Sequence, residues 1–411
     1  MKECIKVGLL GAGTVGSGVL TVLEENTAEI EKKVGVPIHV SKILVRDMKK
    51  AKELSEKYQL TDKIEDIVED PEIDIVVELI GREHPAKEYI AAALEHKKNV
   101  VTANKDVLAK YGKELFPLAE ENKVDFMFEA SVGGGIPIIR PLKSCLAANK
   151  VTSVMGIVNG TTNYMLTKMS QENMDYADVL REAQEKGYAE SDPTADVGGL
   201  DAARKLVILA SIAFNTRIDL SDVLVEGIDG LDLCDIEHGK ELGYAIKLLA
   251  IAKNNAEHGI SVCVRPTMLP VSHPLAGVND VFNAIFVHGN VLGDAMFYGS
   301  GAGKLPTASA VVSDIVDEVK HLNRNIMTMW DQDKVELLPI SDTSKRFFVR
   351  IKGEPQAMRA HLESKFGSIE IVQVESLEGE FGFLTEIMTE GHFEQCQKEF
   401  PSILHRIRVE G

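Results

Sequence analysis

The densest group of chemically active side chains lies between Gly187 and Lys205, where four carboxylates and two cations occupy one short stretch. Asp201, Arg204 and Lys205 are spaced i, i+3 and i+4, so they would share one helix face, with Asp201 in the first turn, where the helix dipole favours an acid. The very apolar run 206–214 follows, which predicts a buried helix. A buried lysine held by an aspartate could donate a proton to a carbonyl, and the remaining carboxylates could receive a substrate ammonium group. The alternative is a surface ion pair worth little.

A glycine motif, GAGTVG, follows the first apolar run and opens a helix-like stretch, as in a dinucleotide-binding fingerprint. Gly11 allows the tight turn, Gly13 lets the backbone approach a pyrophosphate, and Gly16 lets helix and strand pack closely. The N–H groups at the start of the helix would then face the phosphates. A merely structural turn is the alternative. The expected cofactor-binding residues are Gly11, Ala12, Gly13, Thr14, Val15 and Gly16.

The cofactor preference depends on the end of the second predicted strand, where Arg46 precedes Asp47. An arginine there can pair with a 2′-phosphate, and Lys49 and Lys50 add positive charge nearby, which favours NADP over NAD. Asp47 could still bind the ribose, so NAD stays open. A solvated loop is the third reading.

Two further loops follow predicted strands at the edge where open α/β sheets bind ligands. Thr102–Lys105 follows the fourth strand, and Lys105 could contact the substrate or the nicotinamide ribose, or it could be a lysine in solvent. Glu129–Pro137 follows the fifth strand. Its consecutive glycines expose carbonyl oxygens beside a carboxylate, which could hold a hard cation or form a second ligand-approach loop. Gly299–Gly303 precedes a helix and permits another helix start that faces an anion.

The elements that position these residues change character along the chain. Up to residue 145, short apolar runs alternate with helix-favouring stretches, which predicts a doubly wound α/β domain with a mostly parallel sheet. The apolar runs are residues 5–10, 38–45, 73–79, 99–102 and 124–128. The intervening segments 48–60 and 84–98 have apolar residues at three- and four-residue spacing, which predicts helices. We therefore expect residues 1–145 to form an NAD(P)-binding Rossmann domain.

After Lys150 the order becomes helices followed by consecutive strands, which predicts an α+β domain with an antiparallel sheet over residues 146–323. The predicted helices are 163–186, 200–214 and 241–253, and the predicted strands are 151–158, 260–269 and 281–299. This domain would carry the substrate site, the catalytic groups and the dimerisation surface. We expect the helix over 304–323 to pack back on the first domain.

A polar connector over 324–344 separates off the C-terminal segment, residues 345–411. The order strand, helix, strand, strand, helix, strand predicts a ferredoxin-like βαββαβ module. The outer face of the antiparallel sheet before it needs cover, and such modules commonly pair edge to edge. We therefore expect a homodimer or a homotetramer.

Composition and charge exclude several classes of protein. The chain has 411 residues, enough for two or three domains, and 45 basic against 63 acidic residues give a net charge of −18. Such an acidic chain lacks the electrostatic footprint for nucleic acid or an anionic membrane, and no apolar run is long enough to predict a transmembrane helix. The five cysteines are dispersed without a C-x-x-C pair, and the N-terminal apolar run is typical of a strand and not of a signal peptide, which predicts a cytoplasmic protein.

Six motifs in this order and spacing resemble the bacterial type of homoserine dehydrogenase with a C-terminal ACT domain. They are GLLGAGTVG, TANK, EASVGGGIP, VNGTTNYML, GYAESDPTADVGGLDAARKL and YGSGAGKLPTASAVVSDI. The resemblance covers the whole chain and is strongest over residues 1–323. It implies NAD(P)-dependent interconversion of L-homoserine and L-aspartate 4-semialdehyde, in threonine and methionine biosynthesis.

The resemblance also implies roles for matching positions. Lys205 would be the proton donor to the aldehyde oxygen, with Lys105 near substrate and cofactor, and Gly303 would be a late cofactor contact. The implied substrate contacts are Glu190, Asp201, Thr161, Gly187 and Tyr188. The implied monovalent cation, sodium in the family, would be held by Glu129 and the backbone oxygens of Val132, Gly134 and Ile136.

Two departures from the family pattern affect the cofactor and the tail. Lys304 stands where many relatives have a glycine, which adds charge near the cofactor. The first strand-to-helix turn of the tail reads Gly353-Glu354-Pro355-Gln356 and lacks the usual proline-glycine pair, so binding of a threonine effector stays open. An acylating semialdehyde dehydrogenase would need a cysteine nucleophile, which none of the polar motifs contains. A noncatalytic sensor of NAD(P) and amino acids is the alternative from another class.

Overall fold

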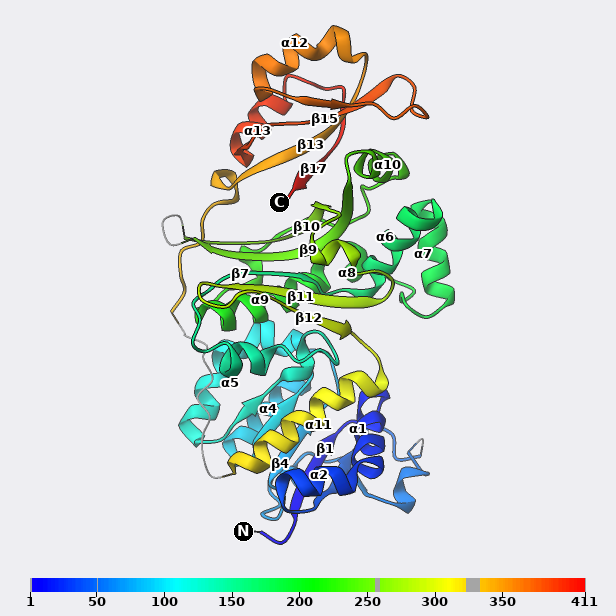
Figure 1. Ribbon diagram of the computed structural model, residues 1–411. Coiled ribbons are helices and arrows are strands. Elements are labelled where there is room, and N and C mark those ends of the chain that lie inside the picture. The colour runs from blue at the N-terminus through cyan, green and yellow to red at the C-terminus, as the bar shows by residue number, and fades with distance from the viewer. Residues whose placement is uncertain (1, 50, 256–258, 323–332, 411) are drawn as a thin grey trace. The chain divides into compact units, whose positions relative to one another are not determined.

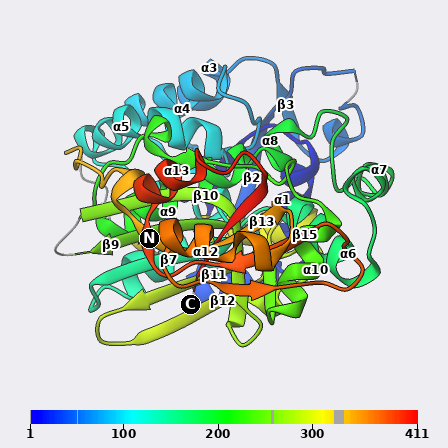
Figure 2. The same ribbon diagram turned by 90° about the horizontal axis from the view of Figure 1, so that it is seen from above.

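The computed structural model describes residues 2–49, 51–255, 259–322 and 333–410 (Figures 1 and 2). The chain divides into two compact units. The first contains Met1–Asn149, Val207–Leu220 and Gly299–Lys334. The second contains Lys150–Leu206, Ser221–Tyr298 and Val335–Gly411.

The first unit is built on a six-stranded parallel sheet, which confirms the predicted doubly wound α/β fold. The strands are β1 (Ile5–Leu10), β2 (Ile38–Leu44), β3 (Gln59–Thr61), β4 (Ile75–Glu78), β5 (Asn99–Thr102) and β6 (Phe126–Met127). Their spatial order is β3-β2-β1-β4-β5-β6. The chain therefore reverses direction of winding between β1 and β4, where sheets of this kind bind a dinucleotide.

Helices cover the sheet of the first unit, and one of them comes from late in the sequence. The helices are α1 (Thr14–Glu25), α2 (Thr27–Val34), α3 (Glu65–Val68), α4 (Ala86–Glu95), α5 (Lys105–Asn122) and α11 (Lys304–His321). Helix α11 packs on α1, where Gly18 leaves just enough room for the backbone of Lys304 and the methyl group of Ala308 (Figure 1). Its buried residues join the core beneath β1.

The helix predicted over residues 48–60 is wrong. Its described residues form turns and a short 3₁₀ helix, Leu54–Glu56, and the segment ends in β3, which pairs with β2. None of its described residues is buried, and the charged ones are exposed. A helix here would therefore gain little from burial, and isolated short helices are marginal. The helix predicted over 84–98 is confirmed as α4.

The second unit contains a mixed sheet in the order β12-β11-β7-β9-β10-β17-β13-β15-β14. Its first strands are β7 (Val151–Ile157), β8 (Leu224–Val225), β9 (Tyr244–Asn255), β10 (Gly259–Pro270), β11 (Phe282–Gly289) and β12 (Gly293–Ser300). The predicted helix over 241–253 is wrong, because residues 244–253 belong to the central strand β9, between β7 and β10, and helix α10 has already ended at Glu241. A continuous apolar run is compatible with either a buried helix or a buried strand.

Helices of the middle segment carry most of the polar residues singled out in the sequence. They are α6 (Gly160–Glu172), α7 (Tyr176–Glu185), α8 (Thr194–Val197), α9 (Leu200–Phe214) and α10 (Leu233–Glu241). The single helical stretch predicted over 163–186 is divided at Asn173, whose backbone is left-handed with φ 52°. Helix α9 has the predicted bounds.

The C-terminal segment has the predicted ferredoxin-like element order, with one extra short strand. Its elements are β13 (Ser344–Lys352), α12 (Pro355–Phe366), β14 (Glu370–Val372), β15 (Glu380–Leu384), β16 (Met388–Thr389), α13 (Glu390–Gln397) and β17 (Ile403–Val409). Helices α12 and α13 cover one face of these strands around a core rich in phenylalanine (Figure 2). Strand β17 also pairs in parallel with β10, so the segment continues the sheet of the same unit.

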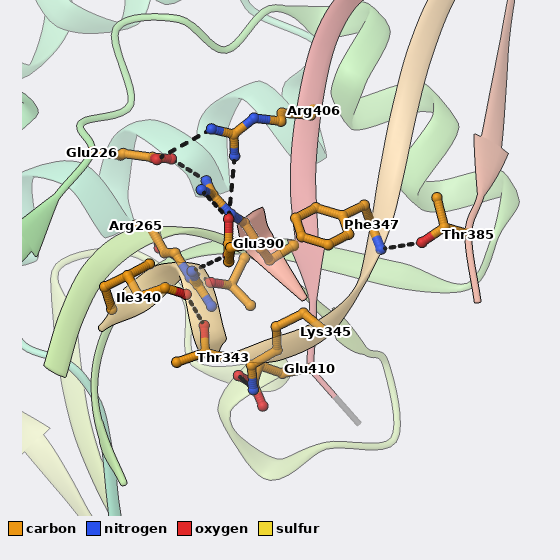
Figure 3. A network of polar contacts seen from close by, with 12 residues as sticks. Glu226, Arg265, Ile340, Thr343, Lys345, Phe347, Thr385, Glu390, Arg406 and Glu410 are labelled. Carbon is orange, nitrogen blue, oxygen red and sulfur yellow. Dashed lines mark hydrogen bonds and ion pairs between the residues drawn. The ribbon is translucent and has the colours of Figure 1, made fainter. Parts of the chain in front are cut away.

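A buried ionic network fastens the C-terminal segment to β10 (Figure 3). The Glu390 carboxylate, 1% exposed, accepts hydrogen bonds from Arg265 of β10 at 2.7 Å and from Arg408 of β17 at 2.9 Å. Arg408 also donates to Glu226, and Arg406 lies within ion-pair distance of both carboxylates. Because a buried carboxylate is costly unless it is paired, the joint depends on all of these partners.

The connector predicted over 324–344 lies partly outside the described residues, and its described part contains the 3₁₀ turn η6 (Ile340–Asp342). None of the helices in the described ranges combines the length and apolar character needed to cross a lipid bilayer.

Candidate active site

Lys205 and Asp201 form a largely buried ion pair on the first turns of α9. The Lys205 ammonium donates to Asp201 Oδ2 at 2.7 Å and to the carbonyl oxygen of Val158 at 2.6 Å. The two side chains are 12% and 9% exposed, so the pair is not of the solvated kind that contributes little. Among the described residues, two of the three ammonium protons have acceptors, which leaves one for a ligand oxygen.

Asn159 completes this group, and the sequence analysis did not single it out as a site residue. Its side-chain amide donates to Asp201 Oδ2 at 2.9 Å and to Asp196 Oδ1 at 2.7 Å. The amide oxygen accepts from the N–H of Thr162 at 2.9 Å, which makes Asn159 the N-cap of α6. Two sequence signals bear on it: an asparagine between a strand and a helix is typical of a cap, and Asn159 lies within the motif VNGTTNYML.

The loop after α7 carries the other predicted substrate contacts. Thr161 donates its hydroxyl to the carbonyl oxygen of Tyr188 at 2.6 Å, so the first turn of α6 holds this loop. Gly187 has a left-handed backbone, φ 74°, and a Cβ there would meet no atom. Tyr188 and Glu190 are exposed. The Glu190 carboxylate is therefore accessible to a ligand in solution.

The glycine motif borders a cavity of about 890 Å³ in the first unit. Gly11 has φ 98°, a Cβ at Gly16 would overlap the carbonyl oxygen of Gly11, and a Cβ at Gly13 would meet no atom. Each glycine thus has the surroundings expected from its position in the fingerprint. Helix α1 begins at Thr14, with Val15 and Gly16 in its first turn and no acidic residue there. The N-terminus keeps its attraction for an anion.

Arg46 and Asp47 line the same cavity, as do residues Leu79–Arg82. Arg46 is exposed, as a residue that meets a 2′-phosphate must be before the cofactor binds. Lys105 is the first residue of α5, partly buried at the carboxyl end of β5. Gly303, exposed and with φ 122°, is the N-cap of α11.

The predicted cation loop is tightly held, and its carboxylate is already engaged. Glu129 accepts backbone N–H groups from Ile138 at 2.5 Å, Ile139 at 2.8 Å and Arg140 at 2.8 Å. The described residues contain no group of three or more acidic, histidine or cysteine side chains fit to hold a metal ion. A cation in this loop would therefore be bound by main-chain oxygens, which Val132, Gly134 and Ile136 could supply.

Helix α11 anchors the same loop through Asp314. Its carboxylate accepts the backbone N–H of Glu129 at 2.7 Å and pairs with Arg140 at 2.7 Å. Burial, together with the nearby Glu129 charge, raises the pKa of Asp314 to about 7. The predicted substrate contacts around Lys205 belong to the second unit, whereas Lys105, the predicted cation loop and the cavity beside the glycine motif belong to the first.

Comparison with known proteins identifies two consecutive family domains. The model for the homoserine dehydrogenase NAD-binding domain matches residues 11–129, and the model for homoserine dehydrogenase matches residues 137–316. The homoserine dehydrogenase of Bacillus subtilis is 44% identical over 401 residues, which are 96% of this chain and 90% of that protein.

Solved structures give the same picture. The crystal structure of a homoserine dehydrogenase from Thiobacillus denitrificans superposes with a TM-score of 0.92 at 40% identity, covering 99% of this chain and 98% of that one. A hyperthermophilic archaeal homoserine dehydrogenase in complex with NADPH has a TM-score of 0.66 at 28% identity, covering 79% of this chain and all of that one (100%).

Proposed function

The chain belongs to the homoserine dehydrogenase family, and on that premise we propose which residues carry out catalysis and which bind the substrate, the cofactor and a cation. It is an NAD(P)-dependent oxidoreductase that interconverts L-homoserine and L-aspartate 4-semialdehyde. A noncatalytic sensor is not favoured, because the two family models, the Bacillus subtilis relative and the two solved structures described above carry the name of this enzyme. We place the reaction in threonine and methionine biosynthesis.

Lys205 is the proton donor in the direction of aldehyde reduction, and its fixed, buried position carries this proposal. The bound nicotinamide supplies a hydride to the aldehyde carbon. As negative charge develops on the aldehyde oxygen, the Lys205 ammonium donates a proton to it. Hydrogen bonds to Asp201 and to the Val158 carbonyl oxygen fix the position of the Lys205 ammonium group. In homoserine oxidation, neutral Lys205 accepts the hydroxyl proton instead.

The amino-acid end of the substrate is recognised by the loop that follows α7. The exposed Glu190 carboxylate pairs with the substrate ammonium group, which is the chemistry that an acidic side chain offers to an amino acid. Thr161 keeps this loop on α6 through its bond to the Tyr188 carbonyl. Gly187 and Tyr188 border the bound substrate.

Arg46 selects NADP over NAD by pairing with the 2′-phosphate. Two observations support this role. Arg46 is exposed and lines the same cavity as Gly11 and Gly13, and the structure of the archaeal relative contains NADPH. Asp47 would serve the ribose if NAD were preferred. The cofactor is also contacted by residues at the starts of two helices of the same unit. These are Gly303 and Lys304 of α11 and Lys105 of α5.

The loop after β6 holds a monovalent cation, sodium, through the backbone oxygens of Val132, Gly134 and Ile136. The left-handed backbone of Gly134, with φ 55°, supports this, because it turns successive carbonyl groups in different directions. The Glu129 carboxylate accepts three backbone N–H groups, so Glu129 contributes by fixing the loop.

The domain roles follow from the same premise. Residues 1–145 bind NAD(P), residues 146–323 carry the substrate site and the dimerisation surface, and residues 345–411 form an ACT-like regulatory module. The enzyme is a cytoplasmic homodimer or homotetramer, which the five unpaired cysteines and the exposed Met296 and Tyr298 on edge strand β12 support. Threonine is the candidate effector, and unchanged activity at saturating threonine would remove it.

The test of the function is the initial rate of nicotinamide oxidation with L-aspartate 4-semialdehyde, measured side by side with NADPH and NADH. We expect turnover with both and a higher kcat/KM with NADPH. If the folded protein binds the cofactor but shows no turnover, the noncatalytic sensor becomes the favoured function.

A further inference from the structure

A buried carboxylate at the carboxyl end of β4 links three parts of the first unit. Glu78 is 0% exposed and accepts hydrogen bonds from the backbone N–H of Ile80 at 2.7 Å and of Gly81 at 3.2 Å. Its second oxygen accepts the hydroxyl of Thr102, on β5, at 2.6 Å. A buried carboxylate is tolerated only when such donors satisfy it, and an apolar residue would fill the same space at less cost.

One branch of this network fixes the wall of the cofactor cavity. Ile80 and Gly81 line that cavity, and Glu78 holds both of their N–H groups. The backbone of Leu79 packs on the glycine motif, since a Cβ at Gly11 would lie 3.1 Å from the carbonyl oxygen of Leu79. Glu78 therefore fixes the surface on which the phosphate-binding turn rests.

The other branch leads to Lys105. The Thr102 hydroxyl oxygen accepts the N–H of Asn104 at 3.0 Å, and the Asn104 side chain caps α5 by accepting the N–H of Val107 at 3.2 Å. The same side chain donates to the carbonyl oxygen of Arg82 at 2.7 Å. Lys105 is the next residue, so the direction in which α5 starts sets the position of its side chain.

We propose that Glu78 is a positioning residue for hydride transfer, which acts through Thr102 and Asn104 to hold Lys105 in a fixed relation to the wall of the cofactor cavity. This inference rests on the proposed role of Lys105. It gives a reason for a carboxyl group in a place where packing alone would favour an apolar one. Small displacements of a reacting or orienting group are enough to lower a rate about a hundredfold.

Thr102→Val is the sharpest test, because it removes the hydroxyl that joins Glu78 to the N–H of Asn104. It leaves Glu78 bonded to the cavity wall and, directly, to the Asn104 side chain. We expect kcat to fall about ten- to a hundredfold, while the Kd for NADPH changes less than about threefold. The primary deuterium isotope effect on kcat, measured with 4-deuterated NADPH, should rise because hydride transfer becomes slower. Thr102→Ser restores the hydroxyl and should return kcat to within about twofold of the wild type.

Thr61 provides a matched control at the end of β3 in the same sheet. It is buried, donates its hydroxyl to the Asp66 carboxylate at 2.5 Å, and accepts the N–H of Lys63, two residues on, at 3.1 Å. Thr61→Val thus removes the same set of bonds away from Lys105. It should lower the Tm as Thr102→Val does and leave kcat and the isotope effect unchanged.

Glu78→Gln keeps the shape of the side chain and replaces one acceptor by a donor, so it serves if Thr102→Val does not fold. It should lower kcat at least as much as Thr102→Val, and the double variant should be no slower than the slower single one, because both substitutions weaken the link between Glu78 and Thr102.

The outcomes separate this inference from the proposed function. Folded Thr102→Val and Glu78→Gln with wild-type kcat, beside a Lys105→Ala variant that has lost turnover, would overturn the positioning role alone. Wild-type turnover in Lys105→Ala would overturn the role of Lys105 and the inference with it. Loss of kcat in Thr61→Val as large as in Thr102→Val would reduce Glu78 to a purely structural group.

Discussion

The side-chain amide of Asn159 lies 2.9 Å from Asp201 Oδ2, the same oxygen that accepts the Lys205 ammonium at 2.7 Å. One carboxylate oxygen thus receives a neutral and a charged donor. The amide fixes where Asp201 points, and Asp201 in turn fixes Lys205. The position of the Lys205 ammonium therefore depends on Asn159, the N-cap residue of α6, as well as on α9.

Asn159→Ser should separate this role from helix capping. Serine keeps an oxygen for the N–H of Thr162, so the loss of stability should stay below about 1 kcal/mol, while the donor to Asp201 disappears. We expect kcat to fall about tenfold with little change in the Kd for NADPH. The matched control is Thr389→Ser, which replaces the N-cap of α13. Equal, small effects of both substitutions on kcat would contradict the prediction.

Arg46→Ala should change cofactor preference. Removing a charge-assisted pair to the 2′-phosphate is expected to raise the KM for NADPH about ten- to a hundredfold and to leave the KM for NADH nearly unchanged. Arg181→Ala, which removes an exposed arginine of α7, is the control for loss of one positive charge. A parallel rise in both KM values would mean that Arg46 supports the loop and does not read the phosphate.

Asp314 should make stability depend on pH. Its folded-state pKa of about 7 lies above the ordinary value of 3.8, so between these values the folded protein binds more protons than the unfolded chain. The free energy of unfolding should therefore fall as pH rises from about 4 to about 7, by at most about 1.4 kcal/mol per pH unit.

Urea unfolding at several pH values checks this, with Asp314→Asn as the test variant. Asparagine keeps an oxygen for the N–H of Glu129 but does not ionise, so the fall between pH 4 and 7 should become smaller. Ser313→Ala, which removes a partner of Arg140 without changing charge, should keep the wild-type slope. The prediction is wrong if Asp314→Asn keeps that slope too.

Glu390→Gln should destabilise the joint between the C-terminal segment and β10. It leaves Arg265 and Arg408 buried without their common counter-charge, and breaking such a pair typically costs about 3–5 kcal/mol. Glu394→Gln removes an exposed carboxylate from the same helix, α13, and should cost less than about 0.5 kcal/mol. Denaturant unfolding measures both, and similar losses in the two variants would show that the network contributes little.

The sequence predicts those parts of the molecule that local pattern determines. Strands β1 and β5 have the predicted bounds, because each is a short apolar run that ends at a glycine or polar loop. The sequence pattern assigns residues 241–253 wrongly, because a continuous apolar run does not distinguish a buried strand from a buried helix. Only the pairing of β9 with β7 and β10 determines that this segment is a strand.

In the candidate active site, too, the sequence predicts local contacts but not long-range ones. Lys205 and Asp201 could be paired from their i,i+4 spacing. Asn159 and Glu78 could not be singled out, because their partners stand 42 and 24 residues away along the chain and are brought together only by the fold. Long-range hydrogen bonds of this kind leave no periodic signal in a single sequence.

The most direct test of the account is a single-turnover measurement of hydride transfer from NADPH to L-aspartate 4-semialdehyde in Lys205→Met, beside the wild type. Methionine fills similar space without a proton to give. We predict that NADPH binds with a Kd within about threefold of wild type and that the rate of hydride transfer falls at least about a hundredfold. A wild-type rate in the folded variant would contradict the assignment of Lys205 as the proton donor.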